Sequence, residues 1–308
     1  MVYAALAAGR RADVAFDAPS DAVQVDLTSA RPVRSPLYEV IARRQCTRAD
    51  YDSRAVSPAD IVHQPRDFET RKRAFGLIVA SQILAMPRGI TVAAPCARTN
   101  SITFVMFRNL CADVLALLER AGSGDGVRVM LFTGKPQLER ILGYVTLANS
   151  AQLNDAAFVA ELKAWIRFSA GDAAAAGDGL YAAASGNPAL PRWLGAPLMS
   201  LLFTAGREND KYARQVRSSP GIAVLVSVAS DKANWVEAGR CYERFALQAT
   251  ALSLRNAMLN QPVEVTALRP QFASWLGVGA GRPDLVVRFG HGPETPRPLR
   301  RPVDAVLA

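Results

Sequence analysis

Residues 221–228 read GIAVLVSV, an apolar run that is rich in β-branched side chains and has the length of a single strand. The run predicts a β-strand. Residues 234–256 follow it and predict one long helix. Five small residues of this predicted helix would let another helix or a flat ligand approach closely: Ala238, Gly239, Ala246, Ala249 and Ala251.

Strand and helix patterns continue on both sides of this run. Residues 268–276 predict a helix and residues 284–289, DLVVRF, predict a strand. Upstream, residues 127–132, VRVMLF, predict another strand. Apolar side chains at helical spacing predict a helix on each side of this strand, and Gly122 ends the first of them. The apolar residues are Leu110, Val114, Leu117 and Leu118 in the first helix and Leu138, Ile141, Leu142 and Val145 in the second.

Two further stretches complete this half of the chain. Residues 155–168 predict a helix buried through Phe158, Leu162, Trp165 and Ile166. Residues 173–195 are rich in glycine and proline and predict mostly loop. Because helices separate the predicted strands, the fold class is expected to be mixed, α+β.

The first 62 residues carry three local signals. Residues 12–16 and 22–28 alternate apolar and polar side chains around a turn-rich DAPSD, which predicts a hairpin. Ser35 followed by Pro36 predicts the start of a helix that ends near Arg44. Ser57 and Pro58 predict a second helix start. Residues 64–108 show no sustained period and receive no assignment.

The charge balance argues only weakly for a nucleic-acid partner. The chain has 36 Lys and Arg against 27 Asp and Glu, a formal net charge of +9. A basic surface attracts phosphate polyanions, but no basic stripe with interleaved aromatic residues appears. The excess of arginine over lysine in an alanine-rich chain is typical of GC-biased coding. We therefore expect no nucleic-acid partner.

The cysteine spacing, the small number of histidines and the hydropathy argue against a metal site and a membrane-spanning segment. Cys46, Cys96, Cys111 and Cys241 match no metal-ligand spacing and are expected to be reduced thiols. Two histidines, His63 and His291, are too few for a His-rich metal site. No export signal is visible, and the longest apolar stretch, residues 75–86, falls short of the roughly 20 residues that span a bilayer. We expect a soluble cytoplasmic protein without a metal or a membrane partner.

Two motifs resemble the nitroreductase superfamily. Residues 43–48, Arg-Arg-Gln-Cys-Thr-Arg, followed by Tyr51, resemble its "RRSxRxF" signature. Residues 282–307, RPDLVVRFGHGPETPRPLRRPVDAVL, resemble its closing strand "PDLVVRIG" and its tail "RRPLEEVL". Residues 237–264 are similar to the long helix and loop behind the flavin ring. The resemblance points to the single-chain, Acg-like subgroup and implies an antiparallel-rich central sheet flanked by helices.

The resemblance implies FMN as cofactor. Arginine forks bind phosphate oxygens bidentately, so arginines from both ends of the chain would hold the FMN phosphate, while amides near residue 260 would meet the ring. The implied cofactor-binding residues are Arg43, Arg44, Gln45, Arg48, Asn256, Asn260, Gln261, Arg300 and Arg301. The catalytic residue is unknown.

Structural explanations stand beside these roles. Arg43 and Arg44 could simply complement the negative end of a helix. The amides after residue 255 could cap that helix or hold its loop. Cys241 is expected to be a buried, small apolar residue rather than a redox centre. His291 is expected in a surface loop rather than as an acid catalyst.

The sequence also departs from the family. It has no "NxQPW" segment, and residues 63–124 interrupt the pattern. This divides the chain into a partial first half (residues 1–62), an unplaced insertion (63–124) and a nitroreductase-like domain (125–308). A chain that lacks part of one half would expose apolar surface, so we expect a homodimer or a poorly stable monomer.

The leading hypothesis is an FMN-dependent oxidoreductase. NAD(P)H would reduce the flavin, which would pass electrons to a small nitroaromatic or quinone-like acceptor. The alternative is a non-catalytic protein that binds or sequesters flavin. A further alternative is a degenerate protein that no longer binds any ligand.

Overall fold

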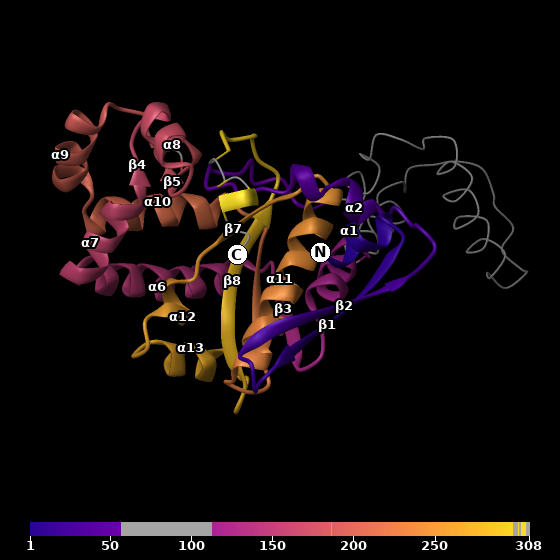
Figure 1. Cartoon of the computed structure of the whole chain (residues 1–308). Helices are drawn as coiled ribbons and strands as arrows, with labels where there is room; N and C mark the ends of the chain where they lie inside the picture. Colours follow the sequence, from indigo (N-terminus) through magenta and orange to yellow (C-terminus); the bar gives the residue numbers. More distant parts are fainter. Residues whose placement is uncertain (57–112, 186, 298–300, 302, 306–308) are drawn as a thin grey trace, which may run out of the picture.

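The computed structural model describes residues 1–56, 113–185, 187–297, 301 and 303–305. Its centre is a four-stranded sheet in the order β3–β6–β8–β7, with every neighbouring pair antiparallel. The strands are β3 (Val127–Phe132), β6 (Gly221–Ser227), β7 (Arg255–Met258) and β8 (Arg282–Gly290). The predicted class, α+β with an antiparallel sheet flanked by helices, is confirmed (Figure 1).

Helices cover both faces of this sheet. Alternate residues of β6 point to opposite faces. Ala223 and Leu225 pack in one apolar cluster with α11 (Lys232–Ala251), while Ile222 and Val224 pack in a second cluster. The helices of the second cluster include α6 (Lys135–Leu153), α10 (Ala205–Arg217) and α13 (Arg269–Leu276). Burial on both faces explains why β6 is an unbroken apolar run.

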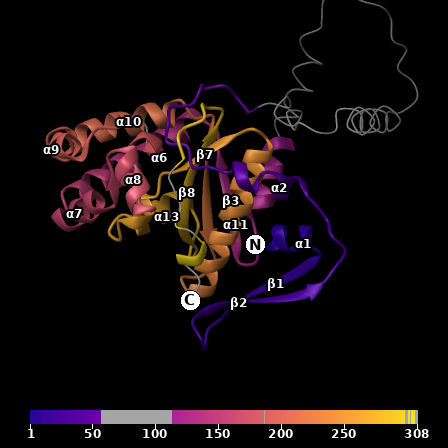
Figure 2. The same ribbon diagram turned by 45° about the horizontal axis from the view of Figure 1, so that its top comes forward.

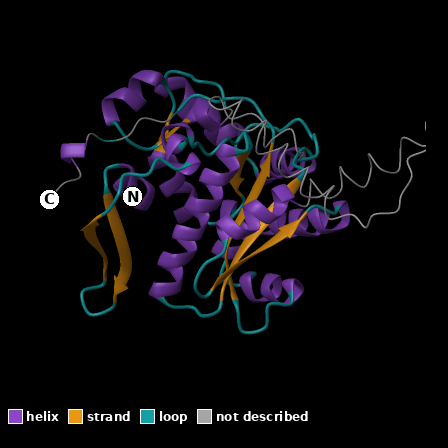
Figure 3. Cartoon of the chain, turned by 90° about the vertical axis from the view of Figure 1, so that its right-hand side faces the viewer, coloured by secondary structure: helices purple, strands orange, loops and turns teal. Residues whose placement is uncertain are grey.

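The predicted N-terminal hairpin is confirmed as β1 (Arg10–Asp17) and β2 (Ala22–Ser29), preceded by α1 (Val2–Ala7). It forms its own sheet on the side of α11 that faces away from the central sheet (Figures 2 and 3). Arg240 of α11 donates a hydrogen bond to the Val14 carbonyl at 3.4 Å. The hairpin is therefore attached to the body through α11.

The helix predicted to run from Ser35 to Arg44 is shorter than expected. Ser35 does cap it, because its Oγ accepts a hydrogen bond from the Tyr38 backbone N–H at 3.2 Å. The α-helix, α2 (Pro36–Glu39), ends after one turn and continues as a 3-10 turn, η1 (Ile41–Arg43). The predicted start at residues 57 and 58 and the stretch 64–108 lie outside the described residues, as do His63 and Cys96.

The stretch between α6 and α10 differs from the prediction in two ways. Helix α7 (Ala156–Trp165) forms, but it has no buried residue, and Trp165 is 47% exposed because the helix lies at the periphery. The predicted loop contains a helix, α8 (Ala170–Ala176), a 3-10 turn, η2 (Ala182–Ser185), and the start of α9 (Arg192–Leu202). Alanine has the highest helix propensity and favours these helices. A run of alanines shows no alternation of apolar and polar side chains, so its sequence does not reveal a helix. Strands β4 (Ile166–Arg167) and β5 (Leu180–Tyr181) pair in parallel nearby.

The long helix ends five residues earlier than predicted. Helix α11 stops at Ala251, and Ser253 has a φ of 59°, a left-handed conformation that an α-helix cannot contain. The chain then enters β7, so Asn256 lies on a strand rather than on a helix. The short helix α12 (Gln261–Glu264) follows, and the predicted helix at 268–276 is confirmed as α13.

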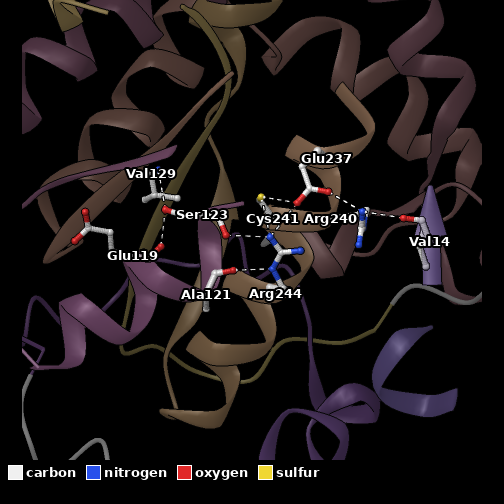
Figure 4. Close-up of polar contacts among 9 residues, drawn as sticks. All are labelled: Val14, Glu119, Ala121, Ser123, Val129, Glu237, Arg240, Cys241 and Arg244. Carbon is white, nitrogen blue, oxygen red and sulfur yellow. Dashed lines mark hydrogen bonds and ion pairs between the residues drawn. The ribbon is translucent and has the colours of Figure 1, made fainter. Parts of the chain in front are cut away.

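A polar cluster on α11 holds the connection that leads into β3. Arg244 donates hydrogen bonds to the carbonyls of Ala121 and Ser123 and forms an ion pair with Glu237 at 3.1 Å (Figure 4). Residues 113–122 are helical, which confirms the described part of the helix that was predicted to end at Gly122. Cys241 lies in this cluster as a buried, free thiol, and burial raises its pKa to about 12. A thiol with this pKa stays protonated and is a poor nucleophile.

Candidate functional site

A short segment after the arginine run, residues 46–52, is held in place from several sides. Cys46 forms a parallel bridge with Asn256 of β7, and the Thr47 N–H donates to the Asn256 carbonyl at 2.8 Å. The Asp52 N–H donates to the carbonyl of His291 at 3.0 Å. These contacts fix the backbone path of this segment between β7 and the end of β8.

Arg288 of β8 is the main support beneath this segment. Its side chain is 0% exposed, and its guanidinium donates to the carbonyls of Ala49 at 2.8 Å and Thr47 at 3.3 Å. It also lies over the ring of Tyr51, 4.1 Å from the ring centroid. Burial lowers the pKa of Arg288 and raises that of Tyr51, which therefore stays neutral. The motif search did not single out this arginine, because its role depends on contacts with residues about 240 positions away.

Arg48 lies between the two carbonyls that Arg288 binds. Gln215 of α10 donates to the Arg48 carbonyl at 2.5 Å, so the backbone of Arg48 is fixed as well. The half-buried side chain of Arg48 has no ion-pair or hydrogen-bond partner among the described residues. Its charge acts to lower the pKa of Tyr212, which burial raises to about 12. Arg48 thus has a fixed backbone and a cationic side chain with no acidic partner in the described part of the chain.

The two ends of the chain meet beside this segment. Gln45 donates from its amide to the carbonyl and hydroxyl oxygens of Thr295, each at 2.9 Å, and to the Pro296 carbonyl at 3.0 Å. Arg297 donates to the carbonyls of Ala42 and, at 3.0 Å, of Arg43. The arginine run and the C-terminal tail, separated by about 250 residues in the sequence, are therefore in direct contact.

Positive charge gathers at this junction. Glu294 accepts a hydrogen bond from Arg255 at 3.0 Å, and this bond holds the pKa of its carboxyl below the usual value. The charges of Arg297 and Arg43 act in the same direction. The Glu294 side chain is exposed, so an anion from solvent could take its place among these three arginines. The motif comparison missed Arg255 and Arg297, although the tail's PRPLRR pattern contains Arg297.

The other predicted arginines have different surroundings. Arg44 is half-buried and forms an ion pair with Glu243 of α11 at 3.1 Å. Arg301 forms an ion pair at 2.8 Å with Asp178, which also pairs with Arg167 of β4 at 2.8 Å. Hydrogen bonds from Arg167 and then Arg301 lower the pKa of Asp178. Arg300 lies outside the described residues.

The three predicted amides also differ from one another. Asn256 is 0% exposed, and its Oδ1 accepts from the Tyr242 hydroxyl at 3.1 Å, so it lies in the core. The side-chain oxygen of Asn260 accepts a hydrogen bond from the Val286 N–H at 3.0 Å, which attaches the residues after β7 to β8. Gln261 donates to the Tyr212 hydroxyl at 2.5 Å, while its buried Oε1 has no hydrogen-bond partner among the described residues.

The prediction that His291 lies in a surface loop is wrong. We expected a surface loop, but the side chain is only 5% exposed because the turn packs against Tyr51 and the end of β8. The backbone carbonyl of His291, which accepts from the Asp52 N–H, is part of the support for residues 46–52.

Three of the predicted residues have polar groups that fit FMN, and a fourth, Asn256, lies in the core. Arg43 and Arg48 offer guanidinium donors for phosphate or ring oxygens, since neither side chain has an acidic partner within ion-pair distance among the described residues. Gln261 offers a free acceptor for the N–H on the pyrimidine edge of a flavin. Asn256 is 0% exposed, and its buried Nδ2 has no hydrogen-bond partner among the described residues.

The described residues contain neither a membrane-spanning helix nor a metal site. Among the helices of the described ranges, none has the length and apolar composition that crossing a bilayer requires. In the same ranges, no group of three or more His, Cys, Asp or Glu side chains is placed to hold a metal ion.

Comparison with known proteins gave low-level structural likeness. No family model and no curated protein matches the sequence. A nitroreductase with bound FMN from Bacteroides fragilis is 13% identical with a TM-score of 0.42, over 87% of this chain and 95% of that one. An FMN-bound nitroreductase from Desulfitobacterium hafniense is 13% identical with a TM-score of 0.40, over 90% and 98%. The FMN-dependent nitroreductase NfnB from Mycobacterium smegmatis, in complex with NADPH, is 14% identical with a TM-score of 0.40, over 75% and 98%.

Proposed function

We propose that the chain is an FMN-binding oxidoreductase of the nitroreductase type, within the Acg-like subgroup. The observation that carries the proposal is the contact between residues 42–45 and residues 295–297. The first stretch overlaps the arginine motif at residues 43–48, and the second lies just before the tail motif at residues 300–307. A fold that brings them together supports a shared ligand, and the surplus of arginine there suits a phosphate dianion.

Each residue would have a defined task. Arg43, with Arg297 and Arg255 beside it, would hold the phosphate in place of the Glu294 carboxylate. Arg48 and Gln261, which contact α10 through Gln215 and Tyr212, would meet the pyrimidine edge of the ring. When bound, FMN would supply the group that accepts a hydride from NAD(P)H and reduces a small nitroaromatic or quinone-like acceptor.

Removing single arginines should rank their roles. We expect Arg43→Ala and Arg48→Ala each to weaken FMN binding by roughly 10- to 100-fold, because each would lose a charge-assisted contact of about 1.5–3 kcal/mol. Arg44→Ala should weaken it less, because Glu243 already holds that side chain. Titration of the flavin-free chain with FMN, followed by quenching of flavin fluorescence, measures these affinities.

Arg54→Ala is the matched control, because Arg54 follows the same segment but pairs with Asp52 at the surface. Its FMN affinity should equal that of the unchanged protein. No saturable FMN binding by the full chain would remove the proposal. A flavin that binds but is not bleached by NADPH would leave a flavin-binding protein and remove the enzymatic part.

We also propose a homodimer. Strands β1 and β2 form a sheet of only two strands in the described structure. The apolar side chains of Val23 and Leu27 on β2 are 46% and 54% exposed. Exposed apolar side chains on a strand with one unpaired edge favour association. Light scattering should give about twice the chain mass of 33.1 kDa, and a stable, compact species of one chain mass would contradict this.

A further inference from the structure

A cavity of about 290 Å³ lies between α9, α10 and the end of β4. This volume is at the lower end of the range for small-molecule sites. Its apolar wall includes two aromatic rings, which suit a flat ligand. The apolar lining residues are Ile166, Phe168, Leu190, Leu198 and Phe203.

The opposite side of this cavity is cationic. Arg207, Lys211 and Arg214 are spaced four and three residues apart on α10, which places them on one face of the helix. One carboxylate, that of Glu208, lies with them, 3.9 Å from Lys211. The cavity lining therefore carries more positive than negative charge.

The three cationic side chains differ in their ion-pair and hydrogen-bond partners. Arg214 reaches Asp50 at 3.8 Å, and Lys211 donates to the Asn187 side chain at 3.4 Å. The guanidinium of Arg207 has neither an ion pair nor a hydrogen bond among the described residues. It is the donor that an incoming anion would meet without displacing an existing partner.

We propose that this cavity binds a small aromatic acid. The ring packs against Phe168 and Phe203, where burial of apolar surface stabilises it. The carboxylate or sulfonate accepts hydrogen bonds from Arg207 and Lys211. The site is distinct from the predicted flavin residues, and its occupation needs no flavin.

Two fluorescent probes test the proposal on the flavin-free, full-length chain. Anilinonaphthalene sulfonate carries the aromatic body and the anion, while phenylnaphthylamine has the same body without charge. The sulfonate should bind at least about 10-fold more tightly than the neutral probe, as expected for two charge-assisted contacts of about 3-fold or more each. Arg207→Gln and Lys211→Gln should each weaken the sulfonate several-fold, by about 3- to 10-fold, and leave the neutral probe unchanged.

Arg217→Gln is the matched control, because Arg217 lies on the same helix but pairs with Glu139 at 2.8 Å, outside this cavity. It should leave both probes unchanged. Equal affinities for the two probes, or a sulfonate affinity insensitive to both Gln variants, would overturn the proposal. So would an equal loss of FMN affinity in Arg207→Gln, because the cavity would then belong to the flavin. Failure of FMN binding alone, with the probe results as expected, would remove only the flavin proposal.

Discussion

Replacing Arg288 by methionine is expected to lower the free energy of unfolding by about 2–4 kcal/mol. Methionine keeps much of the volume but cannot donate to the carbonyls of Thr47 and Ala49, and the cation over the Tyr51 ring is lost. Part of this loss is offset, because a charge no longer has to be buried. Urea unfolding with an unchanged m value measures the difference.

A second measurement separates this support from general stability. If Arg288 positions Arg48, then Arg288→Met should also weaken FMN binding under conditions where the variant is fully folded. Arg128→Met is the control, because Arg128 is exposed on β3, and it should change stability by less than about 0.5 kcal/mol. Equal stability of the two variants would show that the buried guanidinium has no net role.

Phe289→Ala is expected to cost about 3–5 kcal/mol. Phe289 is 0% exposed in β8 and meets Phe245 of α11 edge to face, with ring centroids 6.0 Å apart. It therefore joins the sheet to the helix that covers it. Removal of the ring leaves a cavity that surrounding side chains fill only in part. Thermal and urea unfolding should show the loss without a change of fold.

The ring of Phe289 also explains Gly221, its partner across the β6–β8 pair. A methyl group on Gly221 would lie 2.3 Å from the ring tip, so Gly221→Ala should destabilise the unchanged protein by about 1–3 kcal/mol. In the Phe289→Ala background, the same methyl enters the vacated space and should be neutral or stabilising. A double-mutant cycle with additive effects would contradict this coupling.

Local sequence patterns predicted much of the described fold. The apolar run of β6, the stripe of α6 and the Ser35 cap are each determined within a few residues, because strand and helix periods and caps are local properties. Helix α11 was predicted too long. Residues 252–256 continue an apolar and polar mixture compatible with a helix, and only pairing with β8 makes residues 255–258 a strand.

For the site, the sequence by itself determined which side chains are available: the arginines at 43, 44 and 48, the amides near 260 and the arginine-rich tail. Tertiary structure alone decided how they are used. It brought residues 42–45 against 295–297, enclosed Asn256 in the core, paired Arg44 with Glu243 and placed Arg288 beneath Thr47 and Ala49. The physical reason is that burial and partner choice depend on which distant segments pack together, and no local period or spacing records contacts between residues that are some 200 positions apart.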